Sequence, residues 1–263
     1  MLRPLFRSPR FDARRFAGAL ALAASLLVPV ARAETPASDP RAVAIADQVM
    51  QALGGKPAWD KVTGLRWSFE VTVNDTPRTA RHHAWNKQTG WYRVEGKNRA
   101  GVPFVFIRNL NNDKEGRAWM DGKPIVGDSL QKLMKRTMSV WINDAYWLLM
   151  PYKLLDPGVH LGYEGEVHDS MGTFDRLSLS FDHVGLTPGD HYWVSVNRKN
   201  HRIERWDMML EGQQPPPEHW TLEGWERHDG LWFATAHRQG TLNVFTNGVE
   251  TVHEFPASDF KSP

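Results

Sequence analysis

From residue 64 onward the chain alternates apolar and polar residues in short runs, and this period of two constrains the fold most strongly. In residues 64–73, every odd-numbered residue from Leu65 to Val73 is apolar. Successive side chains of a strand point to opposite faces, so each run predicts a strand with one buried face. Comparable runs recur at 78–87, 91–96, 102–109, 116–122, 160–169, 174–184, 191–197, 202–210, 219–229, 231–239, 241–246 and 250–255.

Turn-forming residues separate these runs, as at Thr89-Gly90, Asp121-Gly122 and Asp229-Gly230. Such pairs are typical of tight hairpins, which join antiparallel neighbours. The sequence contains no segment long enough to act as a linker between two halves. We therefore predict a meander of antiparallel strands that forms a single domain over residues 40–263 and ends in a hairpin between 241–246 and 250–255.

Two stretches follow the helical period instead. In 128–150 the apolar residues recur at steps of three and four, which predicts one long amphipathic helix with Asp128 or Ser129 as its N-cap. A shorter helix is predicted over 40–53, with Asp39 as its N-cap. The fold class is therefore mainly β with helices, of the α+β type.

The first 33 residues have the pattern of a secretory signal peptide. Residues 1–15 are rich in Arg, residues 16–30 are apolar, and residues 31–33 read Ala-Arg-Ala, which fits cleavage before Glu34. We expect 34–39 to be a flexible leader. The alternative is an uncleaved N-terminal anchor, and either the general or the twin-arginine export route fits the Arg pair. The chain has no Cys, so it is neither lipidated nor disulfide-bonded, which favours a bacterial periplasm.

Charge argues against some classes of partner. Of the 32 basic and 30 acidic residues, six Arg and one Asp fall within residues 1–33, so the remainder has a net charge of −3. Basic strands that contain aromatic residues, such as 81–87 and 202–206, would suit a single-stranded nucleic acid. A weakly acidic exported chain lacks the electrostatic footprint for that ligand, so we expect no nucleic-acid partner.

Parts of the chain resemble uncharacterised periplasmic proteins of the LolA/LolB-like (lipoprotein carrier-like) superfamily. The segments that carry the resemblance are 52–59 (ALGGKPAW), 141–158 (WINDAYWLLMPYKLLDPG), 184–208 and 224–235 (GWERHDGLWFAT). The resemblance implies a curved antiparallel half-barrel of about eleven strands, with helices that plug its concave face. It also implies the binding of lipids, or of the acyl chains of lipoproteins, in that concavity.

The predicted concavity has an apolar wall. A curved sheet of aromatic strands must either fill its concave face or bind something apolar there, and Met suits a surface that repacks around variable chains. The candidate ligand-binding residues are Trp67, Phe69, Met134, Met138, Trp141, Trp147, Leu148, Met150, Trp206 and Met208. The alternative is that these side chains complete a solid core.

Polar residues near the long helix have more than one reading. If the helix is continuous, Asp144 falls on its apolar stripe and needs a buried partner. We favour the alternative, in which Asn143 and Asp144 break the helix and cap a second one. Lys153 and Asp156 are candidates for an ion pair at the helix exit, or for a loop held by local hydrogen bonds.

Patterns for catalysis or metal binding are lacking. Adjacent His82 and His83 would point to opposite faces of a strand, and the eleven His include no HExxH motif. No nucleophile elbow, phosphate loop or dinucleotide fingerprint occurs. We therefore expect no catalytic residue, no metal and no cofactor.

These observations favour a monomeric periplasmic carrier that holds the acyl chains of a lipid or an acylated protein and touches a membrane only transiently. The alternative is a non-catalytic protein-interaction or sensor domain. An enzyme that uses the same pocket is the least favoured reading.

Overall fold

The computed structural model describes residues 37–182, 184–187 and 189–263. The expected signal peptide over 1–33 and the first part of the expected leader therefore lie outside the described residues. The helices are α1 (Pro40–Ala52), α2 (Gly55–Lys61), α3 (Gly127–Leu149) and a 3-10 turn, η1 (Met150–Tyr152). The strands are β1 (Gly64–Val73), β2 (Thr76–Asn86), β3 (Trp91–Lys97), β4 (Pro103–Asn109), β5 (Gly116–Met120), β6 (Lys123–Ile125), β7 (Val159–Asp169), β8 (Gly172–Phe181), β9 (His191–Asn197), β10 (Ile203–Met209), β11 (Glu218–His228), β12 (Leu231–Gln239) and β13 (Leu242–Val252).

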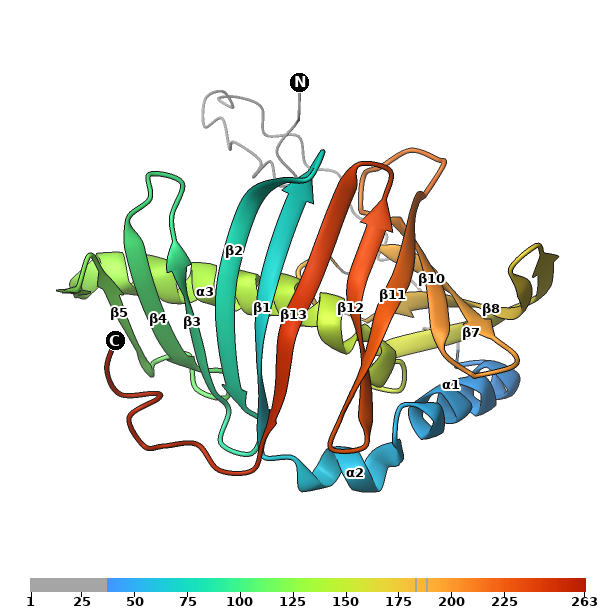
Figure 1. Ribbon diagram of the computed structural model, residues 1–263, viewed down its shortest axis with the longest axis horizontal. Helices are drawn as coiled ribbons and strands as arrows, with labels where there is room; N and C mark the ends of the chain where they lie inside the picture. Colours follow the sequence, from blue (N-terminus) through green and yellow to red (C-terminus); the bar gives the residue numbers. More distant parts are fainter. Residues whose placement is uncertain (1–36, 183, 188) are drawn as a thin grey trace, which may run out of the picture. The chain divides into compact units, whose positions relative to one another are not determined.

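All of these strands belong to one antiparallel sheet. Its spatial order is β6-β5-β4-β3-β2-β1-β13-β12-β11-β10-β9-β8-β7, so β6 and β7 form open edges. The first and last strands of the meander, β1 and β13, pair in its middle (Figure 1). The predicted curved half-barrel is confirmed, with thirteen strands rather than about eleven. Part of the difference is the short strand β6, which pairs with β5 after the turn at Asp121-Gly122.

The predicted final hairpin is wrong, because 241–246 and 250–255 largely belong to the single strand β13. Both halves of β13 pair with β1, and the register shifts opposite Arg66 and Ser68. Gly248 lies at that irregularity with φ +59°, a conformation that costs glycine little. Asn247-Gly248 therefore makes a bulge instead of a turn, since continuous pairing with β1 satisfies the backbone of both halves.

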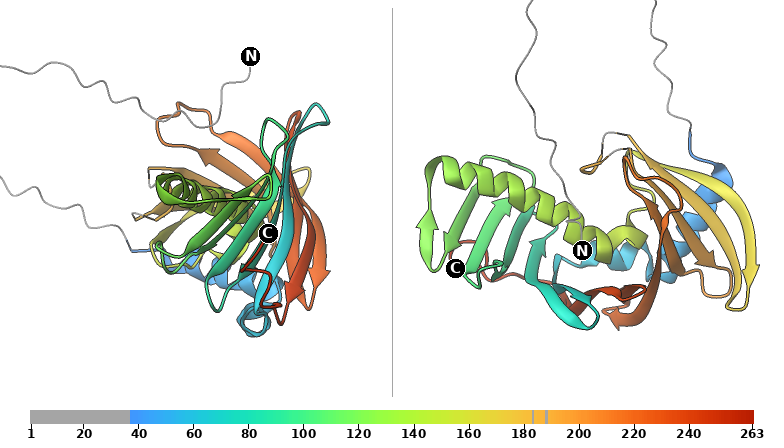
Figure 2. Two further views of the ribbon diagram at one scale, coloured as in Figure 1. Left: turned by 90° about the vertical axis from the view of Figure 1, so that its left-hand side faces the viewer. Right: turned by 90° about the horizontal axis from the view of Figure 1, so that it is seen from above.

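The concave face of the sheet is covered by α3. Figure 2 shows this helix lying across the inside of the curve, with strands on three sides of it. In β1 the inward Leu65, Trp67 and Phe69 are buried, while Arg66 and Ser68 between them face outward. The alternation read from the sequence is thus the alternation between helix-facing and outer side chains.

The long helix differs from its prediction at its start. Val126 occupies the N-cap position and its side chain makes no capping hydrogen bond, so neither Asp128 nor Ser129 is the cap. Gly127 (φ +63°) turns the chain into the helix directly after β6. The connection between β6 and α3 is short, so the helix begins before Asp128 and Ser129.

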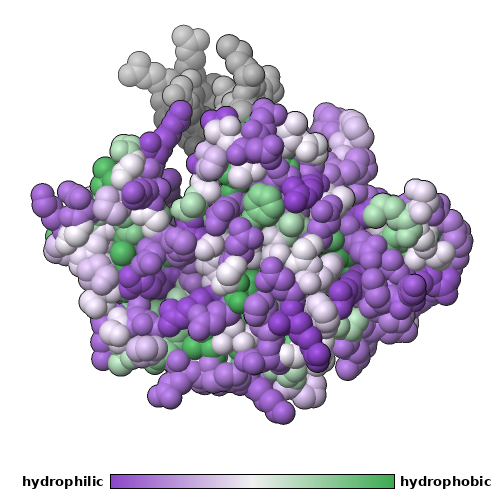
Figure 3. Space-filling model, in the orientation of Figure 1, coloured by the Kyte–Doolittle hydropathy of each residue, from purple (hydrophilic) through white to green (hydrophobic). Residues whose placement is uncertain are grey.

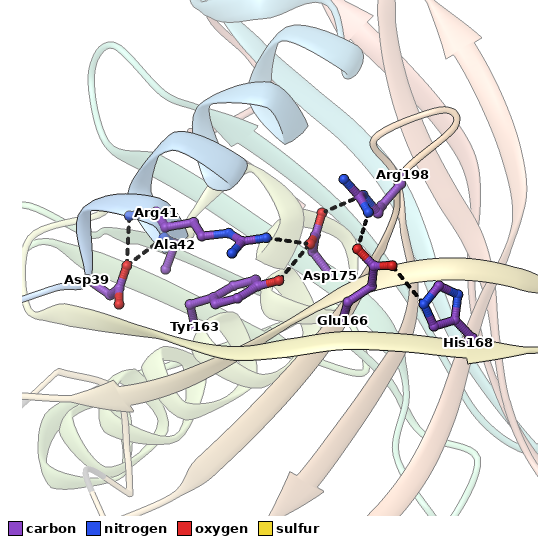
Figure 4. Close-up of polar contacts among 8 residues, drawn as sticks. All are labelled: Asp39, Arg41, Ala42, Tyr163, Glu166, His168, Asp175 and Arg198. Carbon is purple, nitrogen blue, oxygen red and sulfur yellow. Dashed lines mark hydrogen bonds and ion pairs between the residues drawn. The ribbon is translucent and has the colours of Figure 1, made fainter.

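The predicted cap of α1 is confirmed, and a polar network holds this helix against β7 and β8. Asp39 Oδ1 accepts hydrogen bonds from the backbone N–H groups of Arg41 (2.7 Å) and Ala42 (3.2 Å). Arg41 lies 3.7 Å from a carboxylate oxygen of Asp175, which also accepts from the Tyr163 hydroxyl at 3.1 Å (Figure 4). The start of α1 is therefore capped by Asp39, and the Asp175 carboxylate, which both Arg41 and Tyr163 contact, holds the helix to the sheet.

The C-terminal segment covers part of the outer face of the sheet. Phe260 packs on Ala84 and Ile107, and its carbonyl accepts a hydrogen bond from Arg117 at 3.1 Å. Elsewhere the outer face is mostly hydrophilic, with small scattered apolar areas (Figure 3). The apolar surface of the sheet is thus concentrated on its concave side.

Candidate functional site

Beneath α3 the concave strand faces and the buried stripe of the helix form one continuous hydrophobic cluster. Most of the predicted ligand-wall residues are buried in it: Trp67, Phe69, Met134, Leu148, Met150, Trp206 and Met208. Trp141 and Trp147 pack against the cluster while partly exposed, and Met138 is half-buried. The structure therefore brings together the predicted wall except Met138, and the role of the wall in binding stays a prediction.

Trp147 is the centre of an aromatic group near the C-terminal end of α3. Its ring centroid lies 5.0 Å from that of Trp206, 4.7 Å from that of Trp220 and 5.3 Å from that of His237. These three partners come from β10, β11 and β12, respectively. Tilted and edge-to-face arrangements at these distances are favourable, so one helix residue anchors to three strands at once.

The same aromatic group contains buried nitrogen atoms without partners. Among the described residues, no hydrogen-bond partner is found for Nε1 of Trp206, Nε1 of Trp220 or either ring nitrogen of His237. Burial lowers the pKa of His237 to about 3, so its imidazole is neutral at physiological pH. The concave face is therefore mostly apolar, but it carries unpaired polar atoms around Trp147.

A second feature of the site is a buried ion pair between α3 and β2. Arg81 donates from Nε to Oδ2 of Asp144 at 2.5 Å and from Nη2 to Oδ1 at 2.8 Å. His83 Nε2 lies 3.3 Å from Oδ2 of Asp144, and His83 Nδ1 lies 2.8 Å from the Tyr92 hydroxyl. The helix is continuous through Asn143, so the predicted break and cap at this position are wrong.

Burial and hydrogen bonding set the charges of this ion pair. Burial alone would raise the pKa of Asp144, but the adjacent His83 and the hydrogen bonds from Arg81 outweigh burial and lower that pKa. Burial lowers the pKa of His83 despite the nearby carboxylate, and burial raises the pKa of Tyr92. At neutral pH the network therefore holds one carboxylate, one guanidinium and a neutral imidazole.

The other polar residues considered in the sequence, Lys153, Asp156, His82 and His83, lie outside the aromatic group around Trp147. Lys153 and Asp156 form a local ion pair in the turn after η1, and each side chain is about two-fifths exposed. His82 and His83 lie on opposite faces of β2, as predicted. In the described part of the chain, no three His, Cys, Asp or Glu side chains gather in a way that could hold a metal ion. None of the described helices is both long and apolar enough to cross a membrane.

A hollow of about 700 Å³ lies at the β7 edge, away from α3. Polar side chains such as His160 and Ser178 line it together with Trp193. These positions alternate with the buried Leu161, Leu179 and Val194, so the hollow opens on the outer face of the sheet. It is separate from the predicted ligand wall.

Several residues of the site escaped the sequence analysis. Arg81 and His83 lie in a run whose outer and inner positions are both polar, so alternation alone does not mark them as buried. His237 shares its strand face with Leu231 and Phe233, and that pattern was the available signal for its burial. Its lack of partners depends on the neighbouring strands, which the local sequence does not specify.

An open, curved antiparallel sheet wrapped around one long helix defines the class of half-barrel folds. No protein-family model matches the chain, and no curated protein matches it in sequence. Among solved structures it is similar to a LolA superfamily protein from Nitrosomonas europaea, with a TM-score of 0.51 and 9% identity over 84% of this chain and 97% of that one. The expected LolA-like fold is thereby confirmed.

Two further structures align over most of their length at lower scores. A DUF1329 family protein from Desulfovibrio piger gives a TM-score of 0.45 and 12% identity over 85% of this chain and 98% of its own. A putative outer membrane lipoprotein-sorting protein domain from Vibrio parahaemolyticus gives a TM-score of 0.47 and 10% identity over 84% of this chain and 96% of its own.

Proposed function

We propose that residues 40–263 form a single non-catalytic domain that binds the acyl chains of a lipid or a lipidated protein between the concave sheet and α3. The observation that carries the proposal is the continuous apolar wall, rich in Trp and Met, that meets a single amphipathic helix. An apolar concave face with one removable cover suits a long flexible hydrocarbon ligand. The proposed setting is the periplasm, where the protein acts as a monomer without a lipid anchor.

Ligand entry requires α3 to move, because its stripe is packed against the wall. The polar contacts that join the helix to the sheet lie at Arg81–Asp144 and at Arg108, which donates to the Met134 carbonyl at 2.6 Å. Among the described residues, no hydrogen bond joins 145–151 to the sheet. The segment around Trp147 is therefore held by aromatic and aliphatic contacts, which an acyl chain can replace in kind.

The test is native mass spectrometry of the purified protein before and after incubation with phosphatidylcholine vesicles. We expect a one-to-one lipid adduct that survives gentle desolvation, and a smaller yield for Met138→Asp, which adds a charge to a half-buried position of α3. The matched control is Lys132→Asp on the exposed face of the same helix. A protein that carries no lipid under either condition would contradict the proposal and favour a protein-interaction domain.

A further inference from the structure

Three buried side chains on neighbouring strands carry nitrogen atoms without partners. Trp206 is 1% exposed, Trp220 is 4% exposed and His237 is 0% exposed. Their four unpaired nitrogens are Nε1 of each indole and both ring nitrogens of the imidazole. We call these three residues the Trp–His group.

Strand register brings the members of the group to one face. Trp206 and Trp220 are direct partners across β10 and β11. His237 pairs with Leu222, which lies two residues after Trp220 and therefore on the same face of β11. All three members contact the ring of Trp147 at centroid distances of 4.7–5.3 Å.

The unpaired atoms define the chemistry that would complement them. An indole N–H only donates, and a neutral imidazole donates once and accepts once. The group therefore offers three donors and one acceptor within an apolar surface. A buried donor without a partner is destabilising, so a hydrogen-bond acceptor placed here would be held firmly.

That acceptor should be uncharged. The imidazole of His237 is neutral, and burial alone lowers its pKa, with no contribution from a charged side chain. Arg81 lies on β2, in the other half of the sheet, and its guanidinium is engaged by Asp144 of α3. A free carboxylate at the Trp–His group would be an unpaired buried charge, which is strongly unfavourable.

We propose that the Trp–His group binds the ester carbonyl of an acyl ligand, with Trp147 as the side chain that moves aside to admit it. This inference rests on the proposed function and adds a ligand class to it. An ester carbonyl combines a neutral acceptor with a hydrocarbon chain, so it fits donors set in an apolar wall. The protein should therefore select esterified acyl chains over free fatty acids and over ether-linked lipids.

The test compares two phosphatidylcholines with the same chains and head group, one diester and one diether. The two lipids differ only in their ester carbonyls. The ratio of their dissociation constants therefore measures the contribution of the carbonyl contact with the Trp–His group. We expect the wild type to bind the diester about tenfold more tightly, as one or two neutral hydrogen bonds would give. Trp206→Phe and His237→Leu should bring this ratio close to one.

Trp225→Phe is the matched control, because Trp225 also has a buried indole nitrogen without a partner but is not in the group. It should retain the tenfold ratio. Thermal unfolding of each variant verifies folding, and Trp220→Phe replaces any variant that unfolds. Equal affinity of the wild type for diester and diether would overturn this inference and leave the proposed function standing. Binding of neither lipid would overturn both.

Discussion

Asp144→Asn and Arg81→Met remove opposite halves of the ion pair that joins α3 to β2, and they should destabilise the protein by different amounts. The side chain of Asp144 is 1% exposed and that of Arg81 is 22% exposed. The carboxylate also accepts from Asn143 Nδ2 at 2.9 Å, and His83 lies beside it. The two charges are therefore unequally able to reach water when their partner is lost.

The expected magnitudes follow from this difference in exposure. Removing one partner of a buried ion pair costs about 3–5 kcal/mol, because the remaining charge is uncompensated. Arg81→Met leaves the enclosed carboxylate behind, so we expect a loss in this range. Asp144→Asn leaves a guanidinium that can turn toward water and an amide oxygen that still accepts, so we expect a loss of about 1–3 kcal/mol.

The two proteins should also differ in their response to pH. In the wild type the lowered pKa of Asp144 means that its contribution is present above the unfolded pKa of about 4 and is lost as pH falls through the folded value. In Arg81→Met the carboxylate keeps only His83 and the Asn143 amide as partners against the effect of burial, so the pKa of Asp144 should rise. As the pH falls, protonation of Asp144 removes the uncompensated buried charge from the variant. The difference in free energy of unfolding between Arg81→Met and the wild type should therefore become smaller below about pH 5.

Urea unfolding followed by Trp fluorescence at pH 7 and pH 4 measures these quantities. Lys56→Met is the control, because the Lys56–Asp60 pair is exposed and should contribute less than about 0.5 kcal/mol. A double variant, Arg81→Met with Asp144→Leu, should recover much of the loss, since no charge remains buried. The reasoning is refuted if Arg81→Met is no worse than Asp144→Asn, or if its deficit does not narrow in acid.

Other changes test other parts of the molecule. Leu148→Asp should lower the free energy of unfolding by about 3 kcal/mol or more, because Leu148 is 1% exposed, and urea titration beside Lys132→Asp will measure this. His237→Leu should reduce the loss of stability between about pH 6.5 and pH 3, where the unfolded imidazole binds a proton that the folded one does not. The slope of the free energy of unfolding against pH, measured at several pH values, should fall by at most about 1.4 kcal/mol per pH unit, the contribution of one proton. Phe260→Ala should lower the free energy of unfolding by about 3 kcal/mol and raise hydrogen exchange in the strands that the C-terminal segment covers; unchanged exchange there would contradict its packing role.

Much of the local structure followed from the sequence alone. Alternation in 64–73 fixed which residues of β1 face inward, and Asp39 placed the start of α1, because both depend on neighbours within a few residues. The same reasoning identified Trp67, Leu148 and Trp206 as one apolar wall, since their strand or helix faces are apolar by pattern. A resemblance in several segments indicated the half-barrel.

Only the tertiary structure decided how those faces meet. Asn143 and Asp144 have the local propensity to cap a helix, worth about 1 kcal/mol, yet the helix continues through them. Arg81, 63 residues earlier, supplies a buried partner whose loss would cost more than a cap contributes. Register likewise decided the surroundings of His237, because the residues opposite it come from other strands. Alternation assigns a side chain to a face, and the charges and donors that it meets there depend on pairings between distant segments.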